Sequence, residues 1–277
     1  MDRVRQYERR VRKMIDENTK LSTHVFRKMK RHLEDARERV VQMITNAQGW
    51  NAYYYQQYKQ ELDNILAELE RVLSNELQQG LEGGFNSVEE VLRYMIEHFN
   101  LNVSFPVLTL EVLGVSADYS ADLVKGLTSE LRKRLNLYIS QTCLGQMDPY
   151  QLIKLVKDQV VDQPLTFGAV ETRAEAIART EIARVYNTAQ RIQIEKLGQA
   201  MEQTGLQLKK MWVHSHAGKN PRPGHLALDG KKVDYKDYFV VGGHKAWGPH
   251  DPGLPASEVV NCGCGVVPMP EIEWVGS

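Results

Sequence analysis

The run ARTEIARVYNTAQ, residues 178–190, decides how this chain is interpreted. Its apolar positions recur at helical spacing, and four polar side chains stand among them: Arg179, Glu181, Arg184 and Asn187. Arg184 follows Glu181 by three residues, so the two can pair on one face of a helix. We expect these polar groups to be structural and to fix the helix against a neighbouring loop. A helix that carries an active site is the alternative.

The helix around this run is predicted over about residues 169–203 and ends before Gly205. An earlier helix is predicted from about 117 to 144, with Gly145 as its C-cap. Asp148 and Pro149 predict the start of another, as N-cap and first helical residue, which runs to about 161. Residues 103–113 have strand-like composition, but Pro106 excludes a central strand.

The first hundred residues are also helical in pattern. An apolar stripe indicates an amphipathic helix that ends near Gly49, with one break expected near Thr19. A second helix is predicted over 62–77 and is expected to stop at the glycines that follow it, after which Ser87 N-caps a short third helix. We expect these helices to form a separable extension.

The character of the chain changes after Gly205. Strands are predicted at 206–213, 232–235, 239–241 and 265–269, between loops rich in Gly, Pro and His. Asp229 and Gly230 indicate a tight turn in which both supply positive φ angles. The expected fold is therefore mostly α with a small C-terminal α+β unit. The expected segments are an N-terminal extension (1–102), a central helical region (103–205) and an α+β unit packed on the long helix (206–277).

Composition and charge set limits on the kind of protein. The 277 residues have a formal net charge of +0 and a sequence pI of about 7.1, so bulk charge does not predict a DNA-coating protein. Cys143, Cys262 and Cys264 form no disulfide framework, which favours a reducing compartment. Neither a signal peptide nor a bilayer-spanning window is visible, and we expect a protein made in the cytoplasm and not exported.

Charge is uneven along the chain. The first forty residues are rich in arginine and lysine, and residues 61–97 are rich in glutamate and aspartate. Such runs are usually solvated helix faces. The alternative is an interaction arm that meets DNA or an acidic partner.

Downstream of the long helix, several short motifs follow one another in a fixed order. Lys210 and Trp212 form K-x-W in the expected strand. The next loop has the form R-x-x-H-x-x-L-D-G-x-x-V, and an N-C-x-C-x-x-x-P segment closes the series. The residues that supply these two motifs are Arg222, His225, Leu228, Asp229, Gly230, Val233, Asn261, Cys262, Cys264 and Pro268.

Together with Arg179, Glu181 and Asn187, this order resembles the C-terminal domain of phage Mu F-like minor head proteins, also called phage head-morphogenesis proteins. The resemblance covers roughly residues 120–268. Many relatives have Arg where this chain has Gly263, and some have a cysteine pair where it has Arg222 and His225. The extra cysteines of those relatives favour a closed metal site in this part of the family.

The resemblance implies a structural role and no enzyme activity. Proteins like this are low-copy components of the capsid interior, near the portal, and serve head assembly, DNA packaging or retention, or ejection. The implied partners are the portal protein and the major capsid protein, with nonspecific contact to packaged double-stranded DNA and none to a membrane. The implied location is the virion.

A metal site is one further hypothesis for the tail. Thiolates and imidazoles suit zinc, and Cys262 and Cys264 would be joined by His225, with His250 as the expected fourth member. The C-x-C spacing is tighter than usual for zinc. A packed, hydrogen-bonded loop without metal is the alternative.

Two other chemistries are open. Histidine-rich loops can build a metal-dependent nuclease, with His225 as general base. Glu271 and Glu273 form an E-x-E that loosely resembles ADP-ribosyltransferases, although no other motif of that kind precedes it. Lysines interleaved with aromatics in the tail could touch phosphates and stack on bases, or they could be surface lysines over core aromatics.

Overall fold

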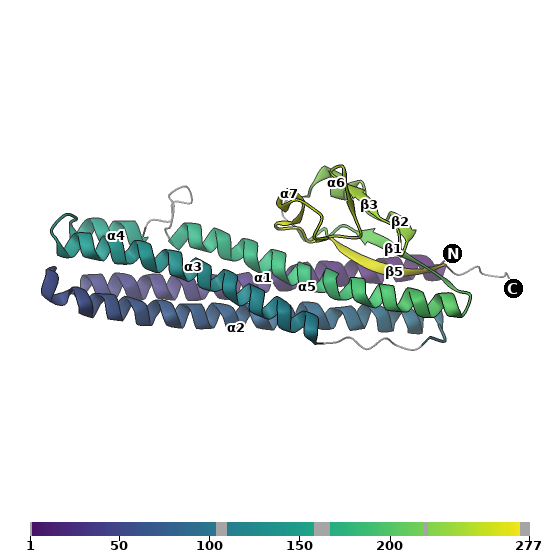
Figure 1. Ribbon diagram of the computed structural model, residues 1–277, viewed down its shortest axis with the longest axis horizontal. Coiled ribbons are helices and arrows are strands. Elements are labelled where there is room, and N and C mark those ends of the chain that lie inside the picture. Colours follow the sequence, from purple (N-terminus) through teal and green to yellow (C-terminus); the bar gives the residue numbers. More distant parts are fainter. Residues whose placement is uncertain (1, 104–109, 158–166, 219–220, 272–277) are drawn as a thin grey trace. The chain divides into compact units, whose positions relative to one another are not determined.

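The computed structural model describes residues 2–103, 110–157, 167–218 and 221–271. Long helices make up most of these residues, and a small strand-containing region follows them (Figure 1). The helices are α1 (Asp2–Thr45), α2 (Ala52–Phe99), α3 (Glu111–Cys143), α4 (Pro149–Lys157) and α5 (Phe167–Gln203). The remainder comprises β1 (Gln207–Val213), α6 (Pro223–Leu226), β2 (Lys232–Asp234), β3 (Phe239–Val241), β4 (His244–Ala246), α7 (Ala256–Val259) and β5 (Gly265–Glu271). The predicted fold class is confirmed.

Contacts within the chain group it into two compact units. The first, here the sheet unit, consists of Met1–Thr23, Gln79–Ala117 and Arg179–Ser277. The second, here the bundle unit, consists of His24–Gln78 and Asp118–Ala178. These groups cut across the boundaries expected at residues 102 and 205. In particular, the first half of α1 belongs with the strands, so residues 1–102 do not form one contact group of their own.

The bundle unit is held by apolar stripes and by ion pairs between its helices. Lys28 on α1 lies 2.9 Å from Glu76 on α2, and Arg39 lies 2.8 Å from Glu68. The basic run of the sequence therefore faces the acidic run within this unit. Lys28 and Arg39 are thus paired within the chain, whereas the interaction-arm hypothesis needs such side chains to be free to bind DNA. Each exposed pair contributes little to stability, about 0–1 kcal/mol, and the buried leucines of α2 supply the core.

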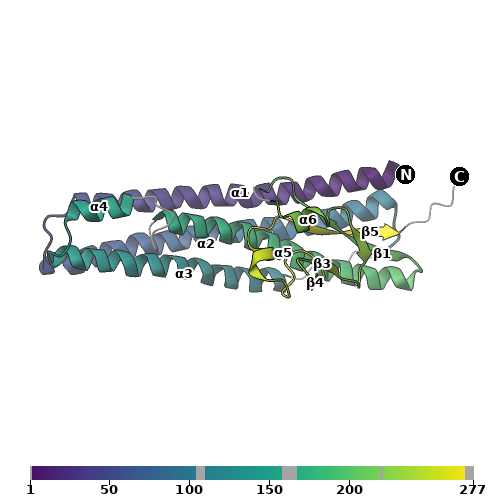
Figure 2. The same ribbon diagram turned by 90° about the horizontal axis from the view of Figure 1, so that it is seen from above.

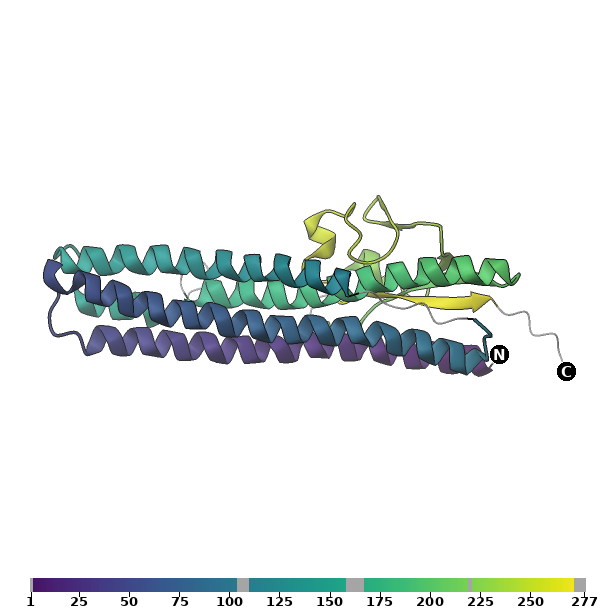
Figure 3. The same ribbon diagram turned by 60° about the horizontal axis from the view of Figure 1, so that its bottom comes forward.

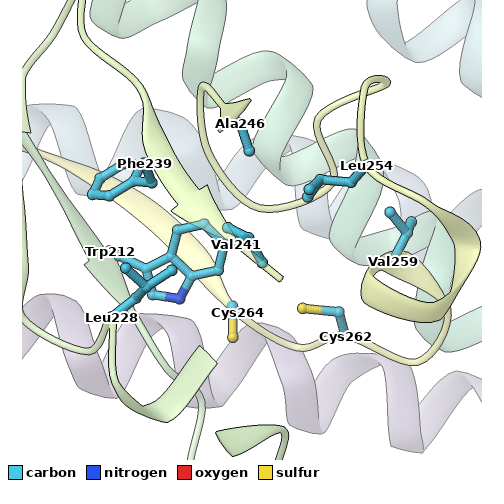
Figure 4. Packing of buried hydrophobic residues seen from close by; sticks show 9 residues of the cluster. All are labelled: Trp212, Leu228, Phe239, Val241, Ala246, Leu254, Val259, Cys262 and Cys264. Atoms are coloured by element: carbon cyan, nitrogen blue, oxygen red, sulfur yellow. The ribbon is translucent and has the colours of Figure 1, made fainter. Parts of the chain in front are cut away.

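The sheet unit contains a three-stranded antiparallel sheet of order β2-β1-β5 and the two-stranded β3-β4 pair. Met211 of β1 pairs with Lys232 on one side and with Val267 on the other. Figures 2 and 3 show β5 beside the N-terminal half of α1 and the C-terminal half of α5. A core of buried side chains lies under the loops (Figure 4): Trp212, Leu228, Phe239, Val241, Ala246, Leu254, Val259, Cys262 and Cys264.

The expected end of the second helix is wrong. α2 continues through Gly80, Gly83 and Gly84 to Phe99. A Cβ at Gly83 would lie 2.8 Å from Leu21, and one at Gly84 would lie 3.0 Å from the backbone oxygen of Ile182. Glycine in a helix costs about 1 kcal/mol, but here it lets α1 and α5 approach closely. Tertiary packing has therefore overridden local propensity.

Two related local expectations are also wrong. Ser87 lies inside α2, where its hydroxyl donates to the Gly84 carbonyl at 2.7 Å instead of capping a helix. α1 does not break at Thr19, whose hydroxyl donates to the carbonyl of Ile15. The expected strand-like segment at 103–113 and the end of the fourth helix near 161 lie largely outside the described residues.

The later expectations agree better with the structure. α5, β1, β2, β3 and β5 lie where the sequence predicts them, within a few residues. Gly145 has the left-handed φ of +72° expected of a C-cap, and Asp148 accepts from the Tyr150 amide at 2.7 Å. The sequence did not predict β4, α6 or α7, which have three or four residues each.

Candidate functional site

A buried cluster of one histidine and two cysteines lies in the sheet unit. The Nδ1 atom of His225 is 3.4 Å from the Sγ atom of Cys262 and 3.5 Å from that of Cys264. All three side chains are nearly closed to solvent. The sequence predicted that these residues converge, although 37 positions separate His225 from Cys262.

Local backbone structure sets the directions of the two cysteines. Asn261 adopts a left-handed φ of +60°, which turns the chain between α7 and β5. The amide of Cys262 donates to Val259, and that of Asn261 donates to the Thr180 hydroxyl of α5. A Cβ at Gly263 would lie 2.9 Å from the Thr19 hydroxyl oxygen, so glycine permits a close approach to α1. Both cysteines therefore face inward toward α6.

Short helix α6 places His225 against them. Pro223 occupies its first turn, where a missing N–H costs nothing. The Arg222 guanidinium donates to the Val260 carbonyl at 2.7 Å and so ties α6 to the α7 loop. The second ring nitrogen of His225, Nε2, lies 2.8 Å from a Glu258 carboxylate oxygen. Sequence reasoning missed Glu258, because only the fold brings it to the histidine.

Two more histidines flank the cluster. The Nδ1 atom of His214 lies 3.4 Å from the Sγ atom of Cys264. His250, the expected fourth member, instead bonds through Nε2 to the Cys262 carbonyl oxygen at 2.9 Å. His250 therefore supports the backbone of the cysteine loop, and it also helps to lower the pKa of the Cys262 thiol through a side-chain hydrogen bond. His214 Nδ1 lies beside the Cys264 sulfur.

Electrostatics within the cluster are strongly coupled. A hydrogen bond from the Cys264 thiol holds the pKa of Cys262 well below its usual range, despite burial. The same bond, together with burial, raises the pKa of Cys264 well above its usual range. Burial opposes charge on His225, but the neighbouring Cys262 sulfur and Glu258 outweigh it and raise the His225 pKa. These shifts favour negative charge on the Cys262 sulfur and positive charge on the His225 ring.

The polar residues of α5 fasten that helix to the sheet. The Asn187 amide donates to the Cys264 carbonyl at 3.0 Å and accepts from the Val266 amide at 3.1 Å. These groups lie on the edge of β5 that faces away from β1. Tyr7 donates to the Pro268 carbonyl on the same edge at 2.8 Å. Asn187 and Tyr7 therefore cover an edge strand that would otherwise expose unpaired backbone groups.

Glu181 and Arg184 pair as expected, with 3.6 Å between Oε1 and Nη2. Glu181 is 5% exposed, and burial raises the pKa of its carboxyl while Arg184 partly opposes that change. Arg179 is buried as well. These side chains lie at a packed face of α5, which favours the structural interpretation of the run at 178–190.

Asp229 lies where the loop, β1 and α1 meet. Its carboxylate accepts two hydrogen bonds from the Arg12 guanidinium, at 2.6 and 2.7 Å, and one from the His214 amide at 2.9 Å. The expected turn is present, but Gly230 alone has a positive φ, +78°, and Asp229 does not. Trp212 is fully buried and packs edge-on against His225 at 5.4 Å between ring centroids.

The first half of α1 supplies contacts that sequence reasoning missed. Asp16 accepts from the Ser215 hydroxyl at 2.9 Å and from the His216 amide at 2.8 Å. Thr19 donates to the Gly263 carbonyl at 3.3 Å, and Glu8 pairs with Lys232. With Arg12, these residues recur every three or four positions along one helical face. That polar stripe was the feature of the sequence from which the contact of α1 with the sheet unit could have been predicted.

A family model described as "Phage Mu protein F like protein" matches residues 129–267, half of the chain. The chain belongs to the phage Mu protein F like family. The match covers nearly all of the span, 120–268, over which the sequence resembles that family. At the level of the family, this is a phage head-morphogenesis protein, and so a component of phage heads.

Two curated proteins are similar to this family member over different spans. The NAD(+)--arginine ADP-ribosyltransferase EFV of Enterococcus faecalis is 39% identical over 92 residues, which are 33% of this chain and 18% of that protein. The uncharacterized protein YqbB of Bacillus subtilis is 25% identical over 217 residues, 77% of this chain and 66% of YqbB. The chain thus spans less than two thirds of either relative. No solved structure matches it.

The described helices include none that is both long and apolar enough to cross a bilayer. The aromatics of the tail are mostly unavailable for stacking on bases: Trp212, Tyr235, Phe239 and Trp247 are buried, and Tyr238 is exposed. Several of the expected basic residues are also engaged. Lys209 pairs with Glu271, and Lys236 pairs with Glu202. Among these aromatics, Tyr238 is therefore the one exposed enough to stack on a base.

Lys210 of the K-x-W motif is fully buried. Its ammonium donates to the Tyr235 carbonyl at 3.0 Å and lies 3.7 Å from the centre of the Trp247 ring. Burial, with a smaller contribution from nearby Arg191, lowers the pKa of Lys210 to about 7, although Glu195, Asp237 and Asp234 oppose the change. Lys210 is therefore a core residue and not part of a basic surface.

The pKa of Lys210 predicts a pH dependence of stability. Above pH 7 the folded chain releases a proton that the unfolded chain keeps until about pH 10.4. Rising pH therefore favours folding. We expect the free energy of unfolding to rise between pH 7 and 9 by roughly 2 kcal/mol more in the native protein than in Lys210→Met. Urea unfolding of both proteins at the two pH values measures this, and equal slopes would contradict it.

Proposed function

We propose that this chain is a structural minor capsid protein of a tailed phage, located inside the head near the portal. It would contact the portal protein and the major capsid protein and act in head assembly, DNA packaging or retention, or ejection. Family membership supports the general role. The finer role rests on one further observation: the family motif residues hold the sheet unit together, and the cavity that Arg179, Asn261 and Cys262 help to line has a volume of only about 10 Å³.

Asn187 is the clearest example of this use of the motif. Its amide NH₂ donates to the carbonyl of Cys264, just before β5, and its amide oxygen accepts from Val266 within β5. Asp229 joins α1 to the loop, and Trp212 fills the small core. In an enzyme, by contrast, such polar groups would be kept free to meet substrate. Motif residues that make contacts within the chain fit a protein that acts through its surface and not through a catalytic centre.

The rival function is a metal-dependent nuclease. Three described histidines of the tail could act as a general base: His214, His225 and His250. Each is buried, and each contacts a cysteine sulfur or a backbone carbonyl. No second cluster of potential metal ligands is found in that part of the chain. The E-x-E hypothesis gains little, because Glu271 pairs with Lys209 and Glu273 lies outside the described residues. We therefore do not propose for this chain the ADP-ribosyltransferase activity that the name of one relative states.

The proposal predicts where the chain is found in a particle. In heads purified from the phage that encodes it, the chain should be present at low copy and should cross-link to the portal protein. Particles made without it should hold less DNA or fail to deliver it. A chain that is found in the lysate but is missing from DNA-filled heads would contradict the proposal.

A cleavage assay separates the structural role from the rival. Purified protein incubated with plasmid DNA and Mg²⁺, Mn²⁺ or Zn²⁺ should leave the plasmid intact. Metal-dependent cleavage that is lost in His225→Ala, while an exposed-site variant such as Thr188→Ala keeps it, would establish the nuclease instead.

A further inference from the structure

The distances in the Cys–His cluster fit a metal ion at its centre. Tetrahedral zinc, with bonds of about 2.3 Å to sulfur and 2.0–2.1 Å to nitrogen, places sulfur and nitrogen ligands about 3.5 Å apart. His225 Nδ1 lies 3.4 and 3.5 Å from the two sulfurs, and the three ligand atoms all lie within 4.8 Å of one another. Both sulfurs thus lie at the distance from one histidine nitrogen that separates sulfur and nitrogen ligands of a tetrahedral zinc ion.

The remaining nitrogen of His225 is held as it is in many zinc sites. A ligating histidine usually donates its other N–H to a carboxylate or carbonyl, which fixes the tautomer and the ring direction. Here Nε2 lies 2.8 Å from Glu258 Oε2, and so Nδ1 is left to face the sulfurs as an electron-pair donor. Arg222, which ties α6 to the α7 loop, keeps the two segments in register.

Two histidines compete for the fourth position. His214 has Nδ1 at 3.4 Å from the Cys264 sulfur, which is again the spacing of neighbouring ligands on zinc. His250 directs Nε2 to the Cys262 carbonyl oxygen and so serves the loop that carries the cysteines. Among the described residues, the ligand atoms that lie within 4.8 Å of one another belong to His225, Cys262 and Cys264, so the His214 ring must move inward to complete the set. His250 would have to give up its bond to the Cys262 carbonyl.

We propose that His225, Cys262, Cys264 and His214 bind one structural zinc ion. Both cysteines bind as thiolates and both histidines as neutral imidazoles, so the protons that these four groups carry in the metal-free protein leave to solvent when the ion enters. Two thiolates, two neutral imidazoles and Zn²⁺ sum to zero charge, which suits side chains that are 2–8% exposed. Four protein ligands leave no open position for water or substrate, as in structural and not catalytic zinc sites.

The site would join three segments that have little core between them. His214 follows β1, His225 lies on α6, and the two cysteines precede β5. The cluster under these loops contains nine buried residues, and the cysteines are two of them. A region so rich in loops gains stability from a metal staple, since apolar burial alone supplies little there.

Metal content of the full chain is the first test. Protein purified without chelator from zinc-supplemented cells should contain about one zinc ion per chain by elemental analysis. Cys262→Ser and Cys264→Ser should each lose it, and Cys143→Ser, which changes the third buried cysteine on α3, should keep it. Zinc below about a tenth per chain in the native protein, with all three thiols free to react once it is unfolded, would overturn the proposal.

Cobalt reports the ligands even if a variant folds poorly. Co²⁺ added to the metal-free native protein should give a thiolate charge-transfer band and the strong visible bands of a tetrahedral site. His214→Ala should shift the visible bands and weaken binding at least tenfold, and His250→Ala should leave the band positions unchanged. The reverse pattern would overturn the assignment of His214. Absence of a charge-transfer band in the native protein would overturn the site itself.

Discussion

Asn187→Ala should cost the sheet unit about 3–5 kcal/mol of unfolding free energy. The Asn187 amide takes the place of a neighbouring strand on the open edge of β5, where it bonds to both Cys264 and Val266. Alanine leaves a buried carbonyl and a buried N–H without partners, at about 1–3 kcal/mol each. It also removes the bond from the side chain to Ala183 and leaves a small cavity. Urea unfolding followed by tryptophan fluorescence measures the loss.

Thr188→Ala is the matched control, because Thr188 is the next residue of α5 and is exposed. It should change stability by less than about 0.5 kcal/mol. Asn187→Asp is informative as well, because a carboxylate can accept from Val266 but cannot donate to Cys264. An intermediate loss is expected. If Asn187→Ala is as stable as Thr188→Ala, the amide does not fasten helix to sheet.

Gly230→Val should destabilise the turn before β2 by roughly 2–4 kcal/mol. Gly230 has a φ of +78°, which a β-branched side chain adopts only with strain. Its Cβ would also lie 3.2 Å from the Arg12 guanidinium, which bonds to the adjacent Asp229. The substitution therefore strains the turn and disturbs the contact of α1 with the loop. Thermal unfolding and limited proteolysis of the purified variant should show the loss.

Gly126→Val controls for the change of residue type. Gly126 lies on an exposed face of α3, has an ordinary helical φ, and leaves open space where a Cβ would stand. Valine is a better helix former than glycine, so this variant should match the native protein or exceed it slightly. A Gly230→Val protein as stable as Gly126→Val would show that the turn tolerates side chains.

Features that depend on local periodicity could be predicted from the sequence. The long helix around 178–190 and four of the five strands follow from apolar spacing and from their glycine and proline boundaries. Convergence of His225 with Cys262 and Cys264 could be predicted as well, because a loop-rich tail needs polar or metal contacts to close. The prolines of β5 are instructive: Pro268 and Pro270 lack an N–H on the edge that β1 does not pair, where proline is tolerated.

Features that depend on tertiary contacts could not be predicted. Gly83 and Gly84 are helix breakers by local propensity, and only the closeness of Leu21 and Ile182 explains their place within α2. His214 and His250 are equally suitable ligands by residue type. The fold alone distinguishes them, since it places His214 Nδ1 beside the Cys264 sulfur and bonds His250 Nε2 to the Cys262 carbonyl.

The polar stripe of α1 has a consequence for how the protein is made. Arg12 bonds to Asp229, Asp16 to Ser215, and Thr19 to Gly263, across separations of 199–244 residues. Residues 12–19 therefore emerge from the ribosome long before their partners do. Contacts so distant in sequence form slowly, and the sheet unit should be among the last parts to become ordered. A fragment limited to the family match, residues 129–267, would lack this stripe and should not be expected to fold as the full chain does.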